Sequence, residues 1–209
     1  LEKYSYLIDL SIDGGHNVLA LLENCIQSIG EGIPKRVRDS GLSDLWFRYF
    51  DSRATEKSWK LRWDPERTIV IHVRLDDVAD LPNSVLPYQQ YIGDEKLQKL
   101  IEHLHNNFPK YDIHLVTSPK QKDVDRCKMV SSPYSCVKGV WGDNCEDYAL
   151  WQMMCSEILV LSRSTFSFVA GLLHRGKNCY IYEDTEIFRI VDGTGDGAIW
   201  KCLDIDFTN

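Results

Sequence analysis

The chain has 209 residues, of which 44% are hydrophobic and 26% are charged, and its net charge is −7 at pH 7. This length suffices to bury a full core, and the composition is that of an ordinary soluble globular protein. The acidic balance argues against sequence-independent binding of nucleic acid, which requires a basic surface. Because no apolar run approaches the roughly 20 residues that cross a bilayer, we expect no membrane span in this segment.

The start of the chain and its cysteines bear on its context. The chain begins Leu-Glu-Lys without Met, which predicts a domain cut from a longer, multidomain chain. None of the seven cysteines forms a Cys-x-x-Cys pair. The pattern favours reduced, packed thiols over a disulfide framework or a zinc site, and it predicts a cytoplasmic protein.

The first third of the chain is predicted to form a separate strand–helix part, residues 1–66. A strand is expected over residues 4–11, then the turn Asp13-Gly14-Gly15 and an amphipathic helix over about 17–29. A short helix is expected over 44–51. The run through Trp59 and Trp63 is interpreted as loop or acceptor surface. Exposed aromatic rings can stack on sugars, but burial is the expected role of most of them.

The remainder, residues 67–209, alternates strands with helices. Strands are predicted at 69–73, 112–117, 136–140, 157–161 and 178–182. Helices are predicted at 94–107, after Pro119, at 146–155 and after Thr165. A Pro-containing loop is expected over 80–92 and a flexible turn over 193–197. This alternation predicts an α/β fold with a mostly parallel, doubly wound, Rossmann-like sheet.

Two polar side chains mark the end of the strand 69–73. Its β-branched residues would lie on both faces, which is typical of a central strand in a parallel sheet. His72 and Arg74 therefore fall where open α/β sheets bind ligands. The planar guanidinium of Arg74 matches phosphate oxygens. Considered singly, Arg74 pairs more commonly with Asp76 or Asp77, and His72 is more commonly a hydrogen-bonded core histidine.

A second motif follows the strand 157–161. There the turn Ser162-Arg163-Ser164-Thr165 opens an apolar helix, so that backbone N–H groups, hydroxyls and the positive helix end come together. Such a combination suits a phosphate or another anion, although a plain N-cap is the commoner reading of this segment alone. We predict that the two strands are neighbouring or near-neighbouring parallel central strands. We also predict that Arg74 and the Ser164–Ser167 turn converge on one phosphate-sized site.

Together the two motifs resemble a known family. His72-Val73-Arg74-Leu75-Asp76-Asp77 resembles the HxRRxD motif of the α-1,2 and α-1,6 fucosyltransferase superfamily, and Ser164-Thr165-Phe166-Ser167 resembles the core of its later NSTFSWW block. The resemblance is good over about 68–182, whereas the turn at residues 13–15 is only loosely similar to the family's first glycine-rich turn. The chain departs from the family in having Leu75 for the second Arg of the first motif and Arg163 for an Asn. One cation is lost and another stands nearby, which leaves the identity of the nucleotide and sugar open.

The resemblance implies a GT-B-like glycosyltransferase with a reduced N-terminal part on the acceptor side. It implies inverting transfer of a deoxyhexose from a nucleotide diphosphate sugar to a hydroxyl of a glycan or glycoprotein, with GDP-fucose the first choice of donor. A rhamnose nucleotide is the second choice, because of the departures at Leu75 and Arg163. No metal and no cofactor beyond the donor are expected. Golgi members carry an anchor, so an anchored full-length chain would be lumenal.

The candidate site residues follow from both lines of reasoning. Donor or phosphate binding is assigned to His72, Arg74, Arg163, Ser164, Thr165, Ser167, Gly14 and Gly15. Arg74 is assigned to the β-phosphate as a catalytic residue. Inversion needs a general base, for which Asp77 and Asp13 rank nearly equal, ahead of Asp76 and His16.

Two other functions remain open from the sequence. A metal-dependent GT-A transferase would use an Asp-x-Asp pair to hold Mn²⁺ or Mg²⁺, and the pairs Asp123/Asp125 and Asp204/Asp206 have that spacing. A non-catalytic sugar- or nucleotide-binding module is consistent with Leu75.

Overall fold

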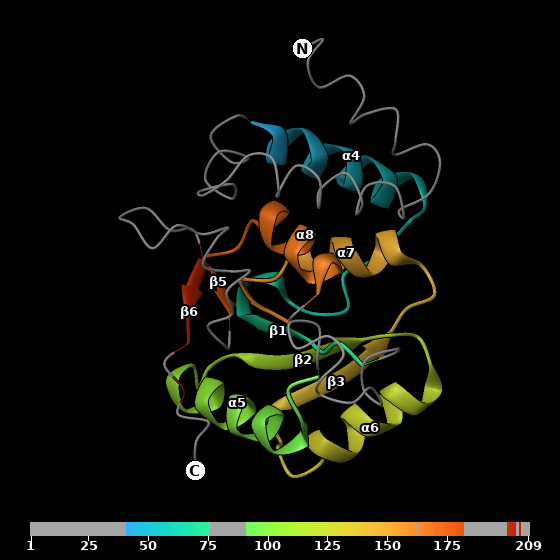
Figure 1. The fold of residues 1–209 in the computed structure, drawn as a ribbon. Helices are drawn as coiled ribbons and strands as arrows, with labels where there is room; N and C mark the ends of the chain where they lie inside the picture. Colours follow the sequence, from blue (N-terminus) through green and yellow to red (C-terminus); the bar gives the residue numbers. More distant parts are fainter. Residues whose placement is uncertain (1–40, 76–90, 163, 182–199, 204, 206–209) are drawn as a thin grey trace.

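The structure is a computed structural model that describes residues 41–75, 91–162, 164–181, 200–203 and 205 (Figure 1). Within them, six strands form one sheet in the order β3-β2-β1-β4-β5-β6. The strands are β1 (Thr68–His72), β2 (Asp112–Thr117), β3 (Val137–Gly142), β4 (Ile158–Leu161), β5 (Asn178–Ile181) and β6 (Trp200–Cys202). The predicted strand 4–11, helix 17–29, turn 193–197 and most of the loop 80–92 lie outside the described residues.

Every pair of neighbouring strands in this sheet is parallel. The parallel α/β sheet predicted from the sequence is thereby confirmed. β1 and β4 are the third and fourth of the six strands, and they pair directly with Ile69 opposite Ile158. All five residues of β1 and all four of β4 are buried, as expected for central strands that are covered on both faces.

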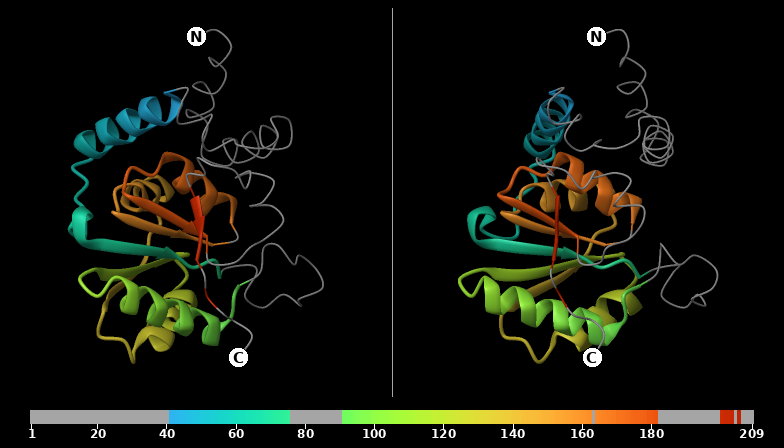
Figure 2. Two further views of the ribbon diagram at one scale, coloured as in Figure 1. Left: turned by 90° about the vertical axis from the view of Figure 1, so that its left-hand side faces the viewer. Right: turned by 60° about the vertical axis from the view of Figure 1, so that its left-hand side comes forward.

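Helices cover both faces of the sheet (Figures 1 and 2). They are α4 (Leu42–Glu56), α5 (Asp94–Asn107), α6 (Gln121–Ser131), α7 (Glu146–Met154) and α8 (Thr165–Leu173), with a 3-10 turn η2 (Pro65–Arg67) before β1. α5 and α6 pack on one face, α7 and α8 on the other, and α4 lies across α7 and α8. None of the described helices is long and apolar enough to cross a membrane.

Alternate strand residues supply the two cores. On β1, Ile69 and Ile71 pack with α5 and α6, whereas Val70 packs with α7 and α8. This follows from the two-residue period of a strand. On α5, the apolar residues recur at the three- and four-residue spacing of one helix face: Leu97, Leu100, Ile101 and Leu104, all buried. The two periodicities together specify which face each element buries.

The largest differences from the sequence-based expectation concern α4 and β6. α4 is longer than predicted, because its second half is held by tertiary contacts: Phe50 and Ala54 are buried against α7 and α8, and Arg53 pairs with Asp147 at 3.3 Å. β6 was not predicted; three residues carry too little pattern, and the pairing with β5 defines the strand. Before the predicted boundary at residue 66, Phe50, Ala54 and Trp63 belong to the same core cluster as α7 and α8.

Most of the thiols that the structure describes are packed, whereas Cys145 is exposed. Cys127, Cys136, Cys145 and Cys155 form no disulfide. Burial raises the pKa of the Cys127 and Cys155 thiols to about 12. At neutral pH these two side chains are therefore protonated, and they act as small apolar groups in the core.

Candidate functional site

The strand order has a switch point between β1 and β4. β2 and β3 extend from one side of β1, and after β3 the chain crosses back to place β4 on the other side of β1. In open α/β sheets, ligands bind in the crevice outside the carboxyl ends of the strands at such a point. β1 ends at His72 and β4 ends at Leu161. Both sequence motifs therefore lie at the position where the topology places a ligand.

Arg74 links the two motifs across this switch point. It follows β1 by two residues, and its Nη1 donates a hydrogen bond to Ser164 Oγ at 3.3 Å. The side chain is partly exposed. The structure thus brings the guanidinium to the turn that precedes α8. The local alternative for Arg74, a pair with Asp76 or Asp77, involves residues outside the described part.

Ser164 is the N-cap residue of α8, but its hydroxyl does not cap the helix. Its backbone carbonyl accepts the first helical hydrogen bond, from Phe168 N at 2.9 Å, while its hydroxyl accepts from Arg74. The first N–H groups of a helix have no intrahelical partner, and they carry the positive end of the helix dipole. An anion at this position would meet an arginine fork and a helix start together.

His72 is buried at this edge, with 6% of its surface exposed. Its Nδ1 lies 2.6 Å from Ser162 Oγ, and its ring packs 5.7 Å from that of Phe166. Burial, and secondarily the charge of Arg74, lower the pKa of His72 to about 3. The imidazole is therefore neutral at physiological pH, and one of its nitrogens is engaged by a protein hydroxyl, as in a hydrogen-bonded core histidine.

Ser167, predicted to bind the nucleotide-sugar donor, is fully buried in the first turn of α8. Its Oγ accepts a hydrogen bond from the Ser162 backbone N at 2.9 Å. The hydroxyl therefore closes the connection between β4 and α8. Thr165 begins α8, and its backbone belongs to the helix start described above.

Leu75 stands where the similar family has its second Arg, and here it is a core residue. Only 1% of its surface is exposed, and it packs with Val73 in the cluster under α5 and α6. Arg74, between them, instead reaches Ser164 on the other side of the chain. Position 75 thus faces the apolar core in this protein, where an unpaired arginine would be costly.

The other predicted site residues lie outside the described part of the chain. They are Asp13, Gly14, Gly15, His16, Asp76, Asp77, Arg163, Asp204 and Asp206. Of the other Asp-x-Asp pair, Asp123 is buried on α6 and accepts a hydrogen bond from Ser118, and Asp125 accepts one from Gln121. Across the described ranges, no group of three or more His, Cys, Asp or Glu side chains could hold a metal ion.

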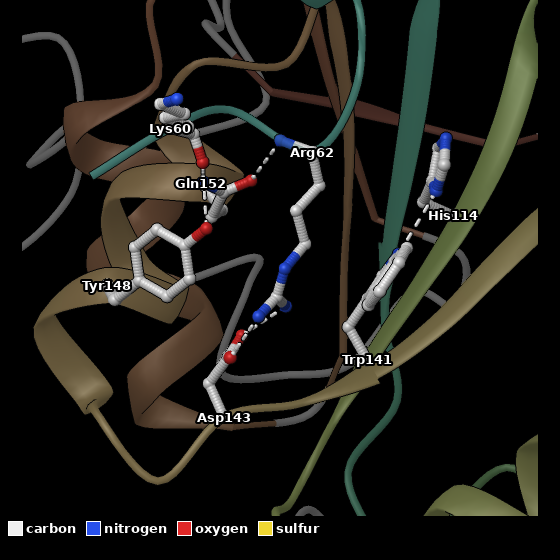
Figure 3. Close-up of polar contacts among 7 residues, drawn as sticks. All are labelled: Lys60, Arg62, His114, Trp141, Asp143, Tyr148 and Gln152. Carbon is white, nitrogen blue, oxygen red and sulfur yellow. Dashed lines mark hydrogen bonds and ion pairs between the residues drawn. The ribbon is translucent and has the colours of Figure 1, made fainter. Parts of the chain in front are cut away.

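A polar cluster that the sequence did not indicate joins the loop before β1 to the end of β3 (Figure 3). Arg62 binds Asp143 with both terminal nitrogens, at 2.7 and 2.6 Å. Its guanidinium lies 4.6 Å from the Trp141 ring centre and 4.9 Å from that of Tyr148. Gln152 accepts from Arg62 N and donates to Lys60 O. These contacts fasten the loop to α7 and to the carboxyl end of β3.

Aromatic packing extends this cluster over the sheet. Trp63 is buried with its ring 4.9 Å from that of His114, and Trp141 Nε1 donates to His114 Nδ1 at 3.1 Å. Trp59 packs on Tyr148. Packing is therefore the role that the structure gives to Trp63. The partners of Arg62 lie 81 and 90 residues along the chain, so no local spacing in the sequence could indicate them.

Comparisons with known proteins give structural likenesses only. No protein-family model matches the chain, and no curated protein matches it. Among solved structures, it is similar to E. coli heptosyltransferase WaaC with ADP (TM-score 0.47, 16% identity, covering 71% of this chain and 41% of that one). It is also similar to E. coli ADP-heptose lps heptosyltransferase II (0.45, 12%, 75% and 42%). A third is POFUT1 in complex with GDP-fucose (0.43, 12%, 76% and 46%).

The chain spans less than half the length of each of these structures. All three TM-scores lie below 0.5. The fold class therefore rests on the strand order and the crossovers described above.

Proposed function

We propose that the protein is a glycosyltransferase that uses a nucleotide diphosphate sugar and binds the diphosphate at the β1–β4 switch point. The observation that carries this proposal is the contact of Arg74 with Ser164 at the start of α8. An arginine fork and a helix N-terminus are each suited to phosphate. Here they meet at the place where the topology favours a ligand. The resemblance of both motifs to a fucosyltransferase superfamily supports the same reaction.

Transfer of the sugar requires that the leaving nucleoside diphosphate be stabilised. As the glycosidic bond breaks, negative charge develops on the β-phosphate of the nucleoside diphosphate. Donors that are already fixed toward that phosphate lower the barrier without reorganising. Arg74 would supply two charge-assisted hydrogen bonds of roughly 1.5–3 kcal/mol each, and the first turn of α8 would supply backbone N–H groups. With these donors the reaction needs no metal ion.

Attack by the acceptor hydroxyl requires a second catalytic group, a general base. In an inverting displacement, a general base takes the proton of the acceptor hydroxyl. We propose Asp77 or Asp13 for this role on the strength of the motif resemblance, with a glycan or glycoprotein as acceptor. His72 is the weaker candidate, because its imidazole is buried and one nitrogen is engaged by Ser162.

The donor is proposed to be a deoxyhexose nucleotide, GDP-fucose first and a rhamnose nucleotide second. GDP-fucose follows from the family resemblance. The rhamnose alternative follows from Leu75, whose burial leaves Arg74 as the cation that the first motif offers to the diphosphate. Arg163 is the nearest candidate for a replacement cation, since it directly precedes Ser164 in the chain.

Binding of GDP, UDP and dTDP in EDTA, measured by thermal shift and calorimetry, tests the proposal. We expect one of them to bind, and Arg74→Ala to weaken that binding at least about 100-fold, since two charge-assisted bonds are lost. Arg74→Lys should restore little, because an ammonium does not replace a planar fork. Arg48→Ala, which removes an exposed arginine on α4, is the matched control. Unchanged affinity in Arg74→Ala would refute the site.

Burial of Leu75 also favours a second function, a nucleotide-sugar-binding module without catalysis, because the motif retains a single arginine. Turnover separates the two. A transferase releases nucleoside diphosphate from GDP-fucose or dTDP-rhamnose in the presence of a glycan acceptor, whereas the module binds the donor without consuming it. Activity that is lost in EDTA and returns with Mn²⁺ or Mg²⁺ would instead favour the GT-A reading.

A further inference from the structure

His72 and Ser162 form a buried link across the switch point. His72 is the last residue of β1, Ser162 is the first residue after β4, and 2.6 Å separates Nδ1 from Oγ. The exposed fractions of the two residues are 6% and 1%. A hydrogen bond shielded to this degree is strong, and leaving either partner unpaired would be costly.

This link and the contact of Arg74 with Ser164 extend the β1–β4 pairing past the ends of the strands. Arg74 reaches Ser164 two residues farther along each segment, so both contacts join residues 90 apart in the chain. Within the strands, the paired residues are 89 apart, as in Ile71 opposite Val160. Beyond the strands, side chains therefore replace the backbone pairing and set the offset between the two motifs.

The link is also fastened to α8. The Ser162 backbone N donates to Ser167 Oγ and its carbonyl accepts from Ser164 N, both at 2.9 Å. Phe166, in the first turn of α8, packs its ring against the imidazole. Through these contacts, the position of His72 fixes the position of the turn that contains Ser164. Because the imidazole is neutral, it makes this bond without placing a second charge beside Arg74.

We propose that His72 is a positioning residue. Through its hydrogen bond with Ser162, it fixes the distance between the end of β1 and the start of α8. At that distance, Arg74 and the N-terminus of α8 can bind the same phosphate. His72 does not itself bind the nucleotide. This inference rests on the proposed function and departs from the assignment of His72 as a donor ligand. It makes the buried pair, rather than the phosphate contacts alone, a determinant of nucleotide affinity.

Substitutions at both ends of the link test this role, with GDP, UDP and dTDP as probes. Ser162→Ala and His72→Phe each remove the link, and each should weaken nucleotide binding by about tenfold, the equivalent of one lost hydrogen bond. The double variant should be little worse than either single one, because both remove the same interaction. His72→Asn is the decisive variant. Its amide places a polar atom where Nδ1 stands but has nothing at Nε2, so it should keep affinity within about threefold.

Urea unfolding of each variant provides the stability readout, and affinities are compared under conditions where each is folded. Three results would overturn the inference while the proposed function stands. The first is nucleotide binding by Ser162→Ala equal to that of the unaltered protein. The second is His72→Asn losing as much affinity as His72→Phe, which would mean that the ring contacts the ligand directly. The third is additive losses in the double variant. If the unaltered protein binds none of the three nucleotides, the proposed function itself fails, and the inference fails with it.

Discussion

Acidification should destabilise the fold through His72. In the folded protein its pKa is about 3, chiefly because of burial and secondarily because of Arg74, against an ordinary value of 6.5. The unfolded chain therefore takes up a proton at this side chain at a higher pH than the folded protein does. Stability from this residue is fully present above about pH 6.5, and it is lost as the pH falls from 6.5 toward 3.

The size of the effect follows from the interval between the two pKa values. Each pH unit below 6.5 costs about 1.4 kcal/mol for one group that stays neutral in the folded state. At pH 5 the loss from His72 is then about 2 kcal/mol. Since small domains are stable by roughly 5–15 kcal/mol, such a loss would shift an unfolding midpoint visibly. His114, whose pKa is also lowered by burial, adds a loss of the same sign.

Urea unfolding at pH 7, 6 and 5, followed by tryptophan fluorescence, measures this loss. The unaltered protein is compared with His72→Asn, which cannot titrate, and with His105→Asn, which removes an exposed histidine on α5. We expect His72→Asn to lose about 2 kcal/mol less between pH 7 and pH 5 than the other two, while His114 contributes equally to all three. Parallel pH dependence in all three proteins would refute the buried, neutral state of His72.

Three further expectations concern positions outside the His72 link. Arg62→Met should lower the free energy of unfolding by roughly 2–3 kcal/mol, because it leaves the mostly buried Asp143 carboxylate unpaired. Adding Asp143→Asn should recover part of the loss. An unchanged urea midpoint in Arg62→Met would contradict the prediction. Gly176→Ala should cost about 3 kcal/mol or more, because a Cβ there would overlap backbone carbonyls of the α7–β4 connection. Gly41→Ala, strained only by its φ of 71°, should cost about 1 kcal/mol, and equal losses for the two glycines would count against the overlap. Leu75→Arg, which introduces the arginine of the motif that this segment resembles, should lower the urea midpoint and leave nucleotide affinity no better, since position 75 faces the core. Tighter nucleotide binding by this variant would show that position 75 faces the site.

The sequence by itself determined the parallel α/β class of the sheet and which strands lie at its centre. Unbroken apolar runs predicted β1 and β4 as neighbouring or near-neighbouring central strands, and the alternation of strands with helices predicted parallel pairing; in the structure the two strands pair directly. The bounds of α5 and β2 match the predicted ranges 94–107 and 112–117. These features depend on the local spacing of apolar residues, and that spacing indicates which face of each helix or strand is buried. It can be read directly along one sequence. The same topology placed Arg74 beside the start of α8.

Only the tertiary structure decided what each polar side chain of the motifs does. Ser164 and Ser167 look alike in sequence, yet one hydroxyl meets Arg74 and the other closes the turn at Ser162. Leu75 and Arg74 are adjacent, yet Leu75 packs in the core and Arg74 contacts Ser164 at the start of α8. Arg62 donates hydrogen bonds to Asp143, which lies 81 residues farther along the chain. After a strand ends, the direction of a side chain depends on the path of the chain and on partners that are remote in sequence. The spacing of apolar residues gives no information about either.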